Sequence, residues 1–75
     1  MEHYKNTGGE SGVAAYEIGS DYIKVKFSDG SIYHYTYLSA GSENIEHMKL
    51  LARGGNGLNA FINSTVRKNY ERKEG

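Results

Sequence analysis

The side chains best suited to chemistry lie near the end of this 75-residue chain, where basic residues gather beside an asparagine. Arg67 and Lys68 follow Asn63, and Arg72 and Lys73 come shortly after them. Guanidinium and ammonium groups bind phosphate, and an asparagine amide can hydrogen-bond to a base. Basic residues at the end of a helix also complement its dipole without any ligand. The sequence is compatible with both interpretations.

The charges are unevenly distributed, although nine basic and nine acidic residues give no net charge. Residues 1–50 carry four Lys or Arg against seven Asp or Glu, and residues 51–75 carry five against two. A neutral domain lacks the high isoelectric point typical of nucleic-acid-binding domains, which favours a protein-interaction or self-associating module. The basic C-terminal third favours the alternative, a module that binds tRNA or single-stranded RNA.

Three alternating tyrosines, Tyr33, Tyr35 and Tyr37, offer a second kind of chemistry, because aromatic rings stack on bases. The turn dipeptide Asp29-Gly30 precedes them and predicts a β-hairpin whose second strand holds the tyrosines. A slip of one residue in the hairpin register moves every side chain to the other face. The register therefore decides whether the rings face a ligand or the core.

One possible register has a two-residue loop at Asp29-Gly30, which places Phe27 opposite Ile32. Directly opposed residues point to the same side, so the tyrosines would share a face with Lys24 and Lys26. Such a face mixes aromatic rings with ammonium groups. It would resemble the binding platforms of proteins that hold single-stranded nucleic acids.

The other possible register has a three-residue loop, Ser28–Gly30, with its glycine left-handed in a bulge. It places Val25 opposite Tyr33 and Ile23 opposite Tyr35, so the hydrophobic residues of both strands form the core side. We favour this register because it gives the cleaner hydrophobic pattern. The residues that would then face water are Lys24, Lys26, His34 and Thr36.

Other catalytic and ligand-binding patterns are weak. Gly55–Ala60 matches the relaxed dinucleotide pattern G-x-G-x-x-A, but it follows a predicted helix instead of a strand, and no βαβ unit fits in the chain. His3, His34 and His47 show no metal-ligand spacing, and no serine lies in a nucleophile elbow. We therefore expect no enzyme activity, no cofactor and no metal.

The hydrophobic pattern predicts one small α+β domain, a three-stranded antiparallel β-meander followed by two α-helices packed on one face. Residues 1–12 are polar and glycine-rich, which predicts a flexible leader. Residues 13–72 form the domain, and residues 73–75 form a frayed tail. A core of this size contributes only about 3 to 5 kcal/mol, so self-association would add useful burial.

The two predicted helices are separated by glycines. Ser42 is the expected N-cap of the first helix, and Asn56 is the expected N-cap of the second. In the second helix Asn63, Arg67 and Glu71 lie at successive i, i+4 positions, which predicts a hydrogen-bonding ladder on one face.

The expected location is the cytoplasm. The chain has no apolar run of about 18 residues that could span a bilayer, and its start lacks the basic and apolar regions of a secretory signal. The absence of cysteine agrees with a soluble cytoplasmic protein.

Several short motifs, taken together, resemble the KTSC domain, a small module found at the C-terminus of some lysyl-tRNA synthetases and as a stand-alone bacterial protein. In the sheet they are Val25-x-Phe27, Gly30 and Tyr33-His34-Tyr35, which is similar to the central Y-x-Y motif of the family. The last motif, Phe61–Tyr70, is similar to F-N-x-x-I-R-x-x-Y with Ile62 inserted after the aromatic residue.

The resemblance spans residues 11–72 and implies little about activity. The chain departs from the family at Leu38-Ser39, where the family has Val-Pro, and at Ala40-Gly41, which lengthens the connection to the first helix. The family has no established activity, and its synthetase context suggests RNA binding. Together with the neutral net charge, the weak catalytic patterns and the lack of an apolar span, this predicts a non-catalytic accessory module whose partner is another protein, a second copy or RNA, and not a membrane. The candidate binding residues are Asn63, Arg67, Lys68, Arg72 and Lys73.

Overall fold

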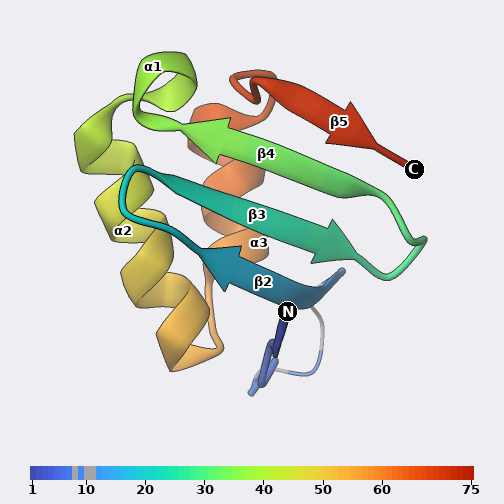
Figure 1. Ribbon diagram of the computed structural model, residues 1–75. Helices are drawn as coiled ribbons and strands as arrows, with labels where there is room; N and C mark the ends of the chain where they lie inside the picture. Colours follow the sequence, from blue (N-terminus) through green and yellow to red (C-terminus); the bar gives the residue numbers. More distant parts are fainter. Residues whose placement is uncertain (8, 10–11) are drawn as a thin grey trace.

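The computed structural model describes residues 1–7, 9 and 12–75 and shows a small α+β fold (Figure 1). Within these residues five strands form one antiparallel sheet in the order β1-β2-β3-β4-β5. The strands are β1 (Glu2–His3), β2 (Val13–Ile18), β3 (Tyr22–Phe27), β4 (Ile32–Thr36) and β5 (Arg72–Glu74). The helices are α1 (Tyr37–Ala40), α2 (Ser42–Gly54), α3 (Leu58–Phe61) and the π-helix η1 (Ile62–Val66).

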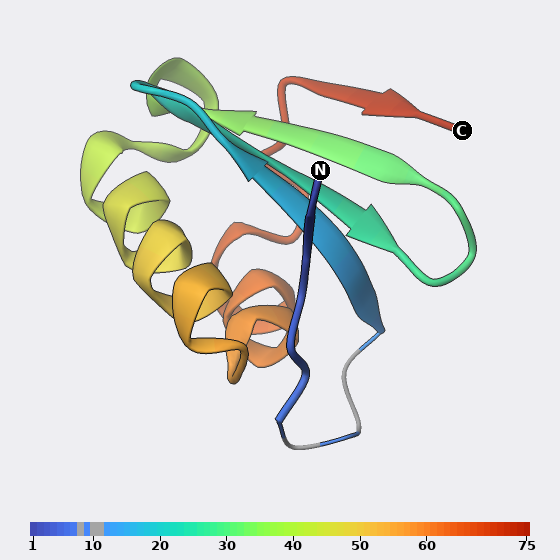
Figure 2. The ribbon, with the colours of Figure 1, turned by 60° about the horizontal axis from the view of Figure 1, so that its bottom comes forward.

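The sheet forms one layer, and α2 and α3 cover one of its faces (Figures 1 and 2). The prediction of an α+β fold with helices on one face of an antiparallel sheet is confirmed. The described sheet has two strands more than the predicted meander, because both ends of the chain join it. Between the layers lie the core residues Tyr4, Val13, Tyr16, Ile23, Val25, Tyr35, Ala40, Ile45, Met48, Ala52, Leu58, Ile62 and Val66.

The β3–β4 hairpin has the bulged register. Val25 pairs with Tyr33, and Ile23 pairs with Tyr35. The backbone N–H of Gly30 donates to the Phe27 carbonyl at 2.9 Å, and the N–H of Phe27 donates to the Ser31 carbonyl at 2.9 Å. Gly30 has a φ of 93°, which a residue with a side chain rarely adopts. The favoured three-residue loop is therefore confirmed, and the two-residue loop is wrong.

Strand β4 ends earlier than predicted, at Thr36, because the next residues form the single helical turn α1. The Thr36 side chain accepts a hydrogen bond from the Ser39 N–H at 3.1 Å, and Ser39 Oγ accepts one from the Thr36 N–H at 3.0 Å. This reciprocal capping box stabilises a helix start. Tyr37, predicted to continue the strand, lies in the helix instead.

Glycines determine both ends of α2. Gly41 is its N-cap, and Gly57 caps α3, so the predicted caps Ser42 and Asn56 each lie one residue away from the actual ones. Gly55 ends α2 in the left-handed conformation, with a φ of 71°. A Cβ atom at Gly55 would lie only 2.5 Å from the Lys5 Cβ, so this glycine also permits close approach of the N-terminal segment.

The N-terminal segment belongs to the domain, although the sequence predicted a flexible leader over residues 1–12. Strand β1 pairs with β2, and Tyr4 is 1% exposed. The Tyr4 hydroxyl accepts a hydrogen bond from the Leu58 N–H at 3.3 Å, at the first turn of α3. A large aromatic side chain therefore ties this segment to the helices. Residues 8, 10 and 11 of the predicted leader lie outside the described residues.

The C-terminal segment also differs from the prediction of a long helix with a frayed tail at 73–75. The chain leaves the helix after Val66 and returns as β5, which pairs with β4. The Glu74 carboxylate bonds to Nε2 of His34, so this histidine is buried instead of facing water as predicted. Charged residues on β5 make an edge strand that discourages pairing with other chains.

Replacing Tyr4 tests whether the N-terminal segment contributes to folding. Tyr4→Ala should lower the free energy of unfolding by about 3 to 5 kcal/mol, because it empties a core site. Tyr4→Phe should cost roughly 1 to 3 kcal/mol, because it leaves the Leu58 N–H without its partner. Urea unfolding followed by circular dichroism measures both.

The neighbouring exposed residue provides the control for this test. His3→Ala should change the unfolding free energy by less than about 0.5 kcal/mol. A Tyr4→Ala variant as stable as His3→Ala would mean that residues 1–7 form the flexible leader that the sequence predicted.

Candidate functional site

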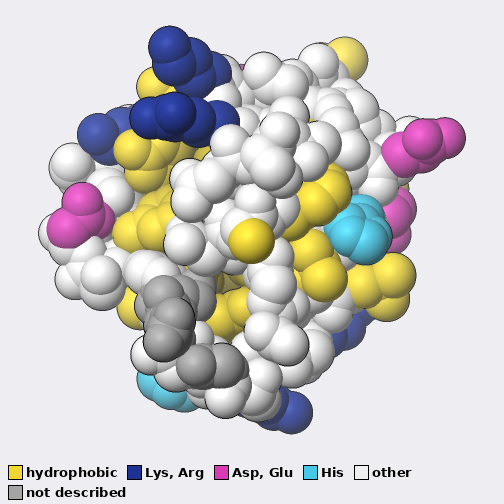
Figure 3. Space-filling view, turned by 180° about the vertical axis from the view of Figure 1, so that it is seen from behind, with side chains coloured by type: hydrophobic (Ala, Val, Ile, Leu, Met, Phe, Trp, Pro, Cys, Tyr) yellow, Lys and Arg dark blue, Asp and Glu magenta, His cyan; other side chains and the backbone are white. Residues whose placement is uncertain are grey.

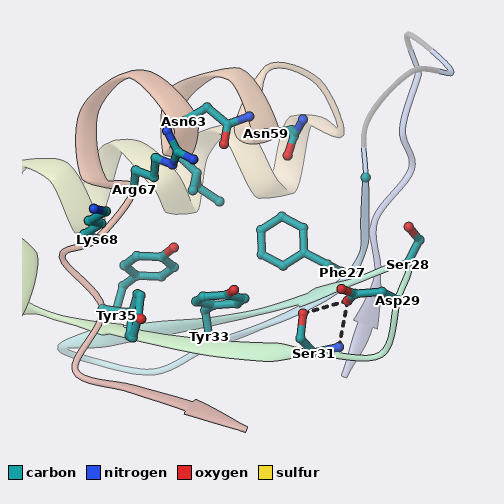
Figure 4. A pocket seen from close by; sticks show the side chains of 13 residues that line it. Phe27, Ser28, Asp29, Ser31, Tyr33, Tyr35, Asn59, Asn63, Arg67 and Lys68 are labelled. Atoms are coloured by element: carbon teal, nitrogen blue, oxygen red, sulfur yellow. Dashed lines mark hydrogen bonds between the residues drawn. The ribbon is translucent and has the colours of Figure 1, made fainter. Parts of the chain in front are cut away.

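A groove of about 490 Å³ lies between the β3–β4 hairpin and the last helical segment (Figure 4). We call it the tyrosine groove. Its three sides are formed by aromatic rings from the sheet, by polar side chains from the helix, and by the hairpin turn. Its lining residues are Gly12, Phe27, Ser28, Asp29, Ser31, Tyr33, Tyr35, Asn59, Ile62, Asn63, Arg67, Lys68 and Tyr70.

The sheet side of the groove is an aromatic cluster. The rings of Tyr33 and Tyr70 meet edge to face with their centres 5.0 Å apart, and Phe27 meets Tyr33 in the same way at 5.3 Å. Tyr35 is 1% exposed, whereas Tyr70 is 37% exposed. Mutual packing holds these rings in fixed orientations. The predicted core role is thus confirmed for Tyr35, while the half-buried Tyr33 lines the groove as well.

Asn59, Asn63 and Arg67 form the helix side, at successive four-residue intervals. In an α-helix residues four apart advance about 40° around the axis, so three of them would spiral away from one line. Here the helix widens into the π-helix η1, which has one residue more per turn. The wider turn reduces the rotation per residue. It therefore keeps the three side chains along the groove (Figure 4).

The predicted ladder from Asn63 to Glu71 does not form. Because the helix ends at Val66, Glu71 leaves that face of the helix. Its carboxylate accepts a hydrogen bond from Thr36 Oγ1 at 3.1 Å, and its backbone N–H donates to the His34 carbonyl at 2.7 Å. Arg67 therefore has no carboxylate from Glu71 beside it. Its guanidinium faces the groove instead.

Arg67 and Lys68 are exposed cations that belong to none of the ion pairs found among the described residues. Seen from behind, lysine and arginine side chains gather at one edge of the molecule beside hydrophobic surface (Figure 3). An unpaired cation next to aromatic rings is available to an anionic ligand.

The five predicted site residues are only partly brought together. Asn63, Arg67 and Lys68 line the tyrosine groove. Lys73 lies close by, with its Nζ 5.4 Å from the centre of the Tyr33 ring. Arg72 pairs with His34 across the strands, so it lies on the other side of β5, and its guanidinium is 3.6 Å from the Glu74 carboxylate. It is not part of the groove.

The hairpin turn adds a carboxylate that was not among the predicted site residues. Asp29 Oδ1 accepts hydrogen bonds from Ser31 Oγ at 2.6 Å and from the Ser31 N–H at 2.9 Å. These bonds, the Ser31 hydroxyl foremost, lower the pKa of Asp29, and the charge of Lys73 adds to the effect. Asp29 is therefore ionised at neutral pH.

A second hollow of about 430 Å³ has Lys24 in its lining, and this cation is already paired. The Lys24 ammonium lies 3.6 Å from the Glu17 carboxylate, and the same carboxylate accepts a hydrogen bond from the Tyr22 hydroxyl at 2.9 Å. The pKa of Glu17 is lowered, chiefly by the bond from Tyr22. The tyrosine groove, with its unpaired cations, is therefore the better candidate for a ligand site.

Two further properties of the described residues concern ligands and membranes. The described residues contain no group of three or more His, Cys, Asp or Glu side chains that could hold a metal ion. None of their helices is long and apolar enough to cross a membrane.

The burial of Tyr35 predicts a loss of stability at alkaline pH. Burial raises the pKa of Tyr35 to about 12, and the neighbouring Tyr33 and Tyr70 add to the rise. The unfolded chain releases this proton near pH 10, so the free energy of unfolding should fall by roughly 2 kcal/mol between pH 10 and 12. Urea unfolding across this range should show a smaller loss in Tyr35→Phe.

Tyr22→Phe is the comparison for the Tyr35 measurement, because the hydrogen bond to Glu17 also raises the pKa of Tyr22, but at a more exposed position outside the groove. It should retain most of the alkaline loss. An unchanged pH profile in Tyr35→Phe would show that Tyr35 does not cause it.

Comparisons with known proteins leave the family of this chain open. No family model, no curated protein and no solved structure matches it. These comparisons therefore neither support nor contradict the resemblance to the KTSC domain.

Proposed function

We propose that this protein is a non-catalytic RNA-binding module that holds an unpaired stretch of RNA in the tyrosine groove. The observation that carries the proposal is the position of Arg67 and Lys68, two cations without ion-pair partners among the described residues, beside an aromatic wall. Cations that follow the phosphates and rings that stack on bases are the two components of single-strand recognition.

The polar helix side supports the same ligand. The amides of Asn59 and Asn63 line the groove. Each can donate a hydrogen bond to a base edge through its NH2 group and accept one through its oxygen. No hydrogen bond is found for either amide in the described part of the chain. Amides, cations and rings thus converge on one cavity, whose volume lies within the range of about 300 to 1,000 Å³ common for ligand pockets.

The π-helix supports the resemblance to the KTSC domain, whose synthetase context suggested RNA. η1 begins at Ile62, the residue that stands as an insertion against the family's last motif. A π turn contains one residue more than an α turn, so it can absorb such an insertion without shifting the residues after it. We propose membership of this family on the motifs and this turn together.

Removing the two cations tests the proposal. Titrations with tRNA and with a single-stranded RNA oligonucleotide at low and moderate salt should show binding that weakens as salt rises. Arg67→Ala and Lys68→Ala should each weaken binding and reduce the slope of log affinity against log salt by about 0.7, because each removes one phosphate contact.

Lys26→Ala is the matched control, because it removes the same charge from the other side of the sheet, away from the groove. It should leave the salt slope nearly unchanged. Absence of salt-dependent binding at tens of micromolar protein would contradict RNA binding. An equal effect of all three variants would contradict the groove as its site.

The second candidate function, a protein-interaction or self-associating module, is favoured by one specific observation. Leu38 on α1 is 96% exposed, so its apolar side chain is available for contact with a partner. A partner protein or a second copy would bury it. The unpaired cations of the groove have no role in this alternative, and we therefore place it second.

Light scattering tests self-association directly. If the chain self-associates through α1, its mass should rise with concentration, and Leu38→Ser should return it to the monomer. Leu50→Ser removes a leucine that is 64% exposed on α2 and should have no such effect. A monomer at all concentrations would contradict self-association.

A further inference from the structure

The two ends of the tyrosine groove carry opposite charges. In Figure 4 Lys68 lies at one end and Asp29 at the other, with the rings of Tyr35, Tyr33 and Phe27 between them. Arg67 projects over the rings from the helix side. The phosphate of a bound nucleotide is attracted to the basic end and repelled from the acidic end. Although Lys73 also lies near Asp29, these charges favour one direction for a ligand with one phosphate and one base.

The carboxylate at the acidic end has one oxygen free for a ligand. Both hydrogen bonds from Ser31 go to Oδ1 of Asp29, and among the described residues no donor is found for Oδ2. The same bonds hold the carboxylate in place, so its orientation is fixed before a ligand arrives. An ionised carboxylate accepts hydrogen bonds and cannot donate them.

We infer that Asp29 determines base specificity in the groove, and that it selects bases with an exocyclic amino group over uracil. This inference rests on the proposed RNA-binding function. With the phosphate at Arg67 and Lys68, the base stacks on the aromatic cluster and its edge faces Asp29. Cytosine offers an amino donor at position 4, where uracil has a carbonyl oxygen that the carboxylate repels.

Cytosine and uracil form the sharpest pair for this test, because both are pyrimidines of the same size. Binding of oligo(C) and oligo(U) RNA of equal length is measured at one low salt concentration. The unmodified chain should bind oligo(C) about tenfold more tightly, as expected for one hydrogen bond to a charged group. In Asp29→Asn the ratio should fall to about twofold or less, because the asparagine amide can donate to the uracil oxygen as well.

Two features keep this variant interpretable. The asparagine retains an Oδ1 acceptor for Ser31, so the turn can form. Glu43→Gln on α2, outside the groove lining, removes the same charge and is the control for a general electrostatic effect. It should leave the ratio between oligo(C) and oligo(U) unchanged.

The outcomes separate this inference from the proposed function. Equal binding of oligo(C) and oligo(U) by the unmodified chain overturns the role of Asp29 and leaves RNA binding in place. A tenfold ratio that persists in Asp29→Asn also overturns it. Absence of binding to either oligonucleotide overturns the proposed function and this inference with it.

Discussion

The bulge at Gly30 is the constraint on which the rest of the structure depends. One extra residue in the hairpin loop determines which side of β4 faces the helices. With the bulge, Tyr33 and Tyr35 lie on the side of α3 and η1, and Lys24 and Lys26 lie on the other side. Without it, the rings would leave the core and the groove would lose its aromatic wall.

The small size of the chain explains why both ends join the sheet. A three-stranded sheet with two short helices buries little surface, and domains of this size are marginally stable. Tyr4 fills a core site next to Leu58, and β5 covers one edge of β4. The same return of the chain brings Tyr70 against Tyr33 and Lys73 over its ring. The C-terminal segment therefore both stabilises the fold and completes the groove.

The central strands could be predicted from the sequence because they depend on local patterns. Residues 22–27 alternate between the two faces, and Asp29-Gly30 predicts a tight turn between two strands. The ends of the chain could not be predicted, because their order comes from contacts with distant residues. Tyr4 lies in a polar, glycine-rich segment, and its partner Leu58 is more than fifty positions away.

The candidate site was predicted in part for the same reason. Asn63, Arg67 and Lys68 share one short segment and could be grouped by spacing, whereas Asp29 and Tyr33 reach the groove only through the hairpin. The sequence also groups Arg72 with them, because the helical spacing continues past Val66, where the helix ends. Because alternate residues of a strand face opposite sides, β5 places Arg72 on the side away from the groove.

One signal for the π-helix was present in the sequence. Leu58, Ile62 and Val66 are buried at strict four-residue intervals, whereas an α-helix repeats every 3.6 residues. In an α-helix this buried row would rotate by about 80° over its length, from one border of the apolar stripe toward the other. The wider turn of η1 keeps the row on the core side.

The groove side chains follow the buried row by one residue each, at Asn59, Asn63 and Arg67. Each polar residue therefore lies one step around the helix from its buried neighbour, and the two rows run side by side. Whatever aligns the buried row with the core also aligns the polar row with the groove. The irregular turn that the core requires is thus the same one that presents an amide and a guanidinium to the tyrosines.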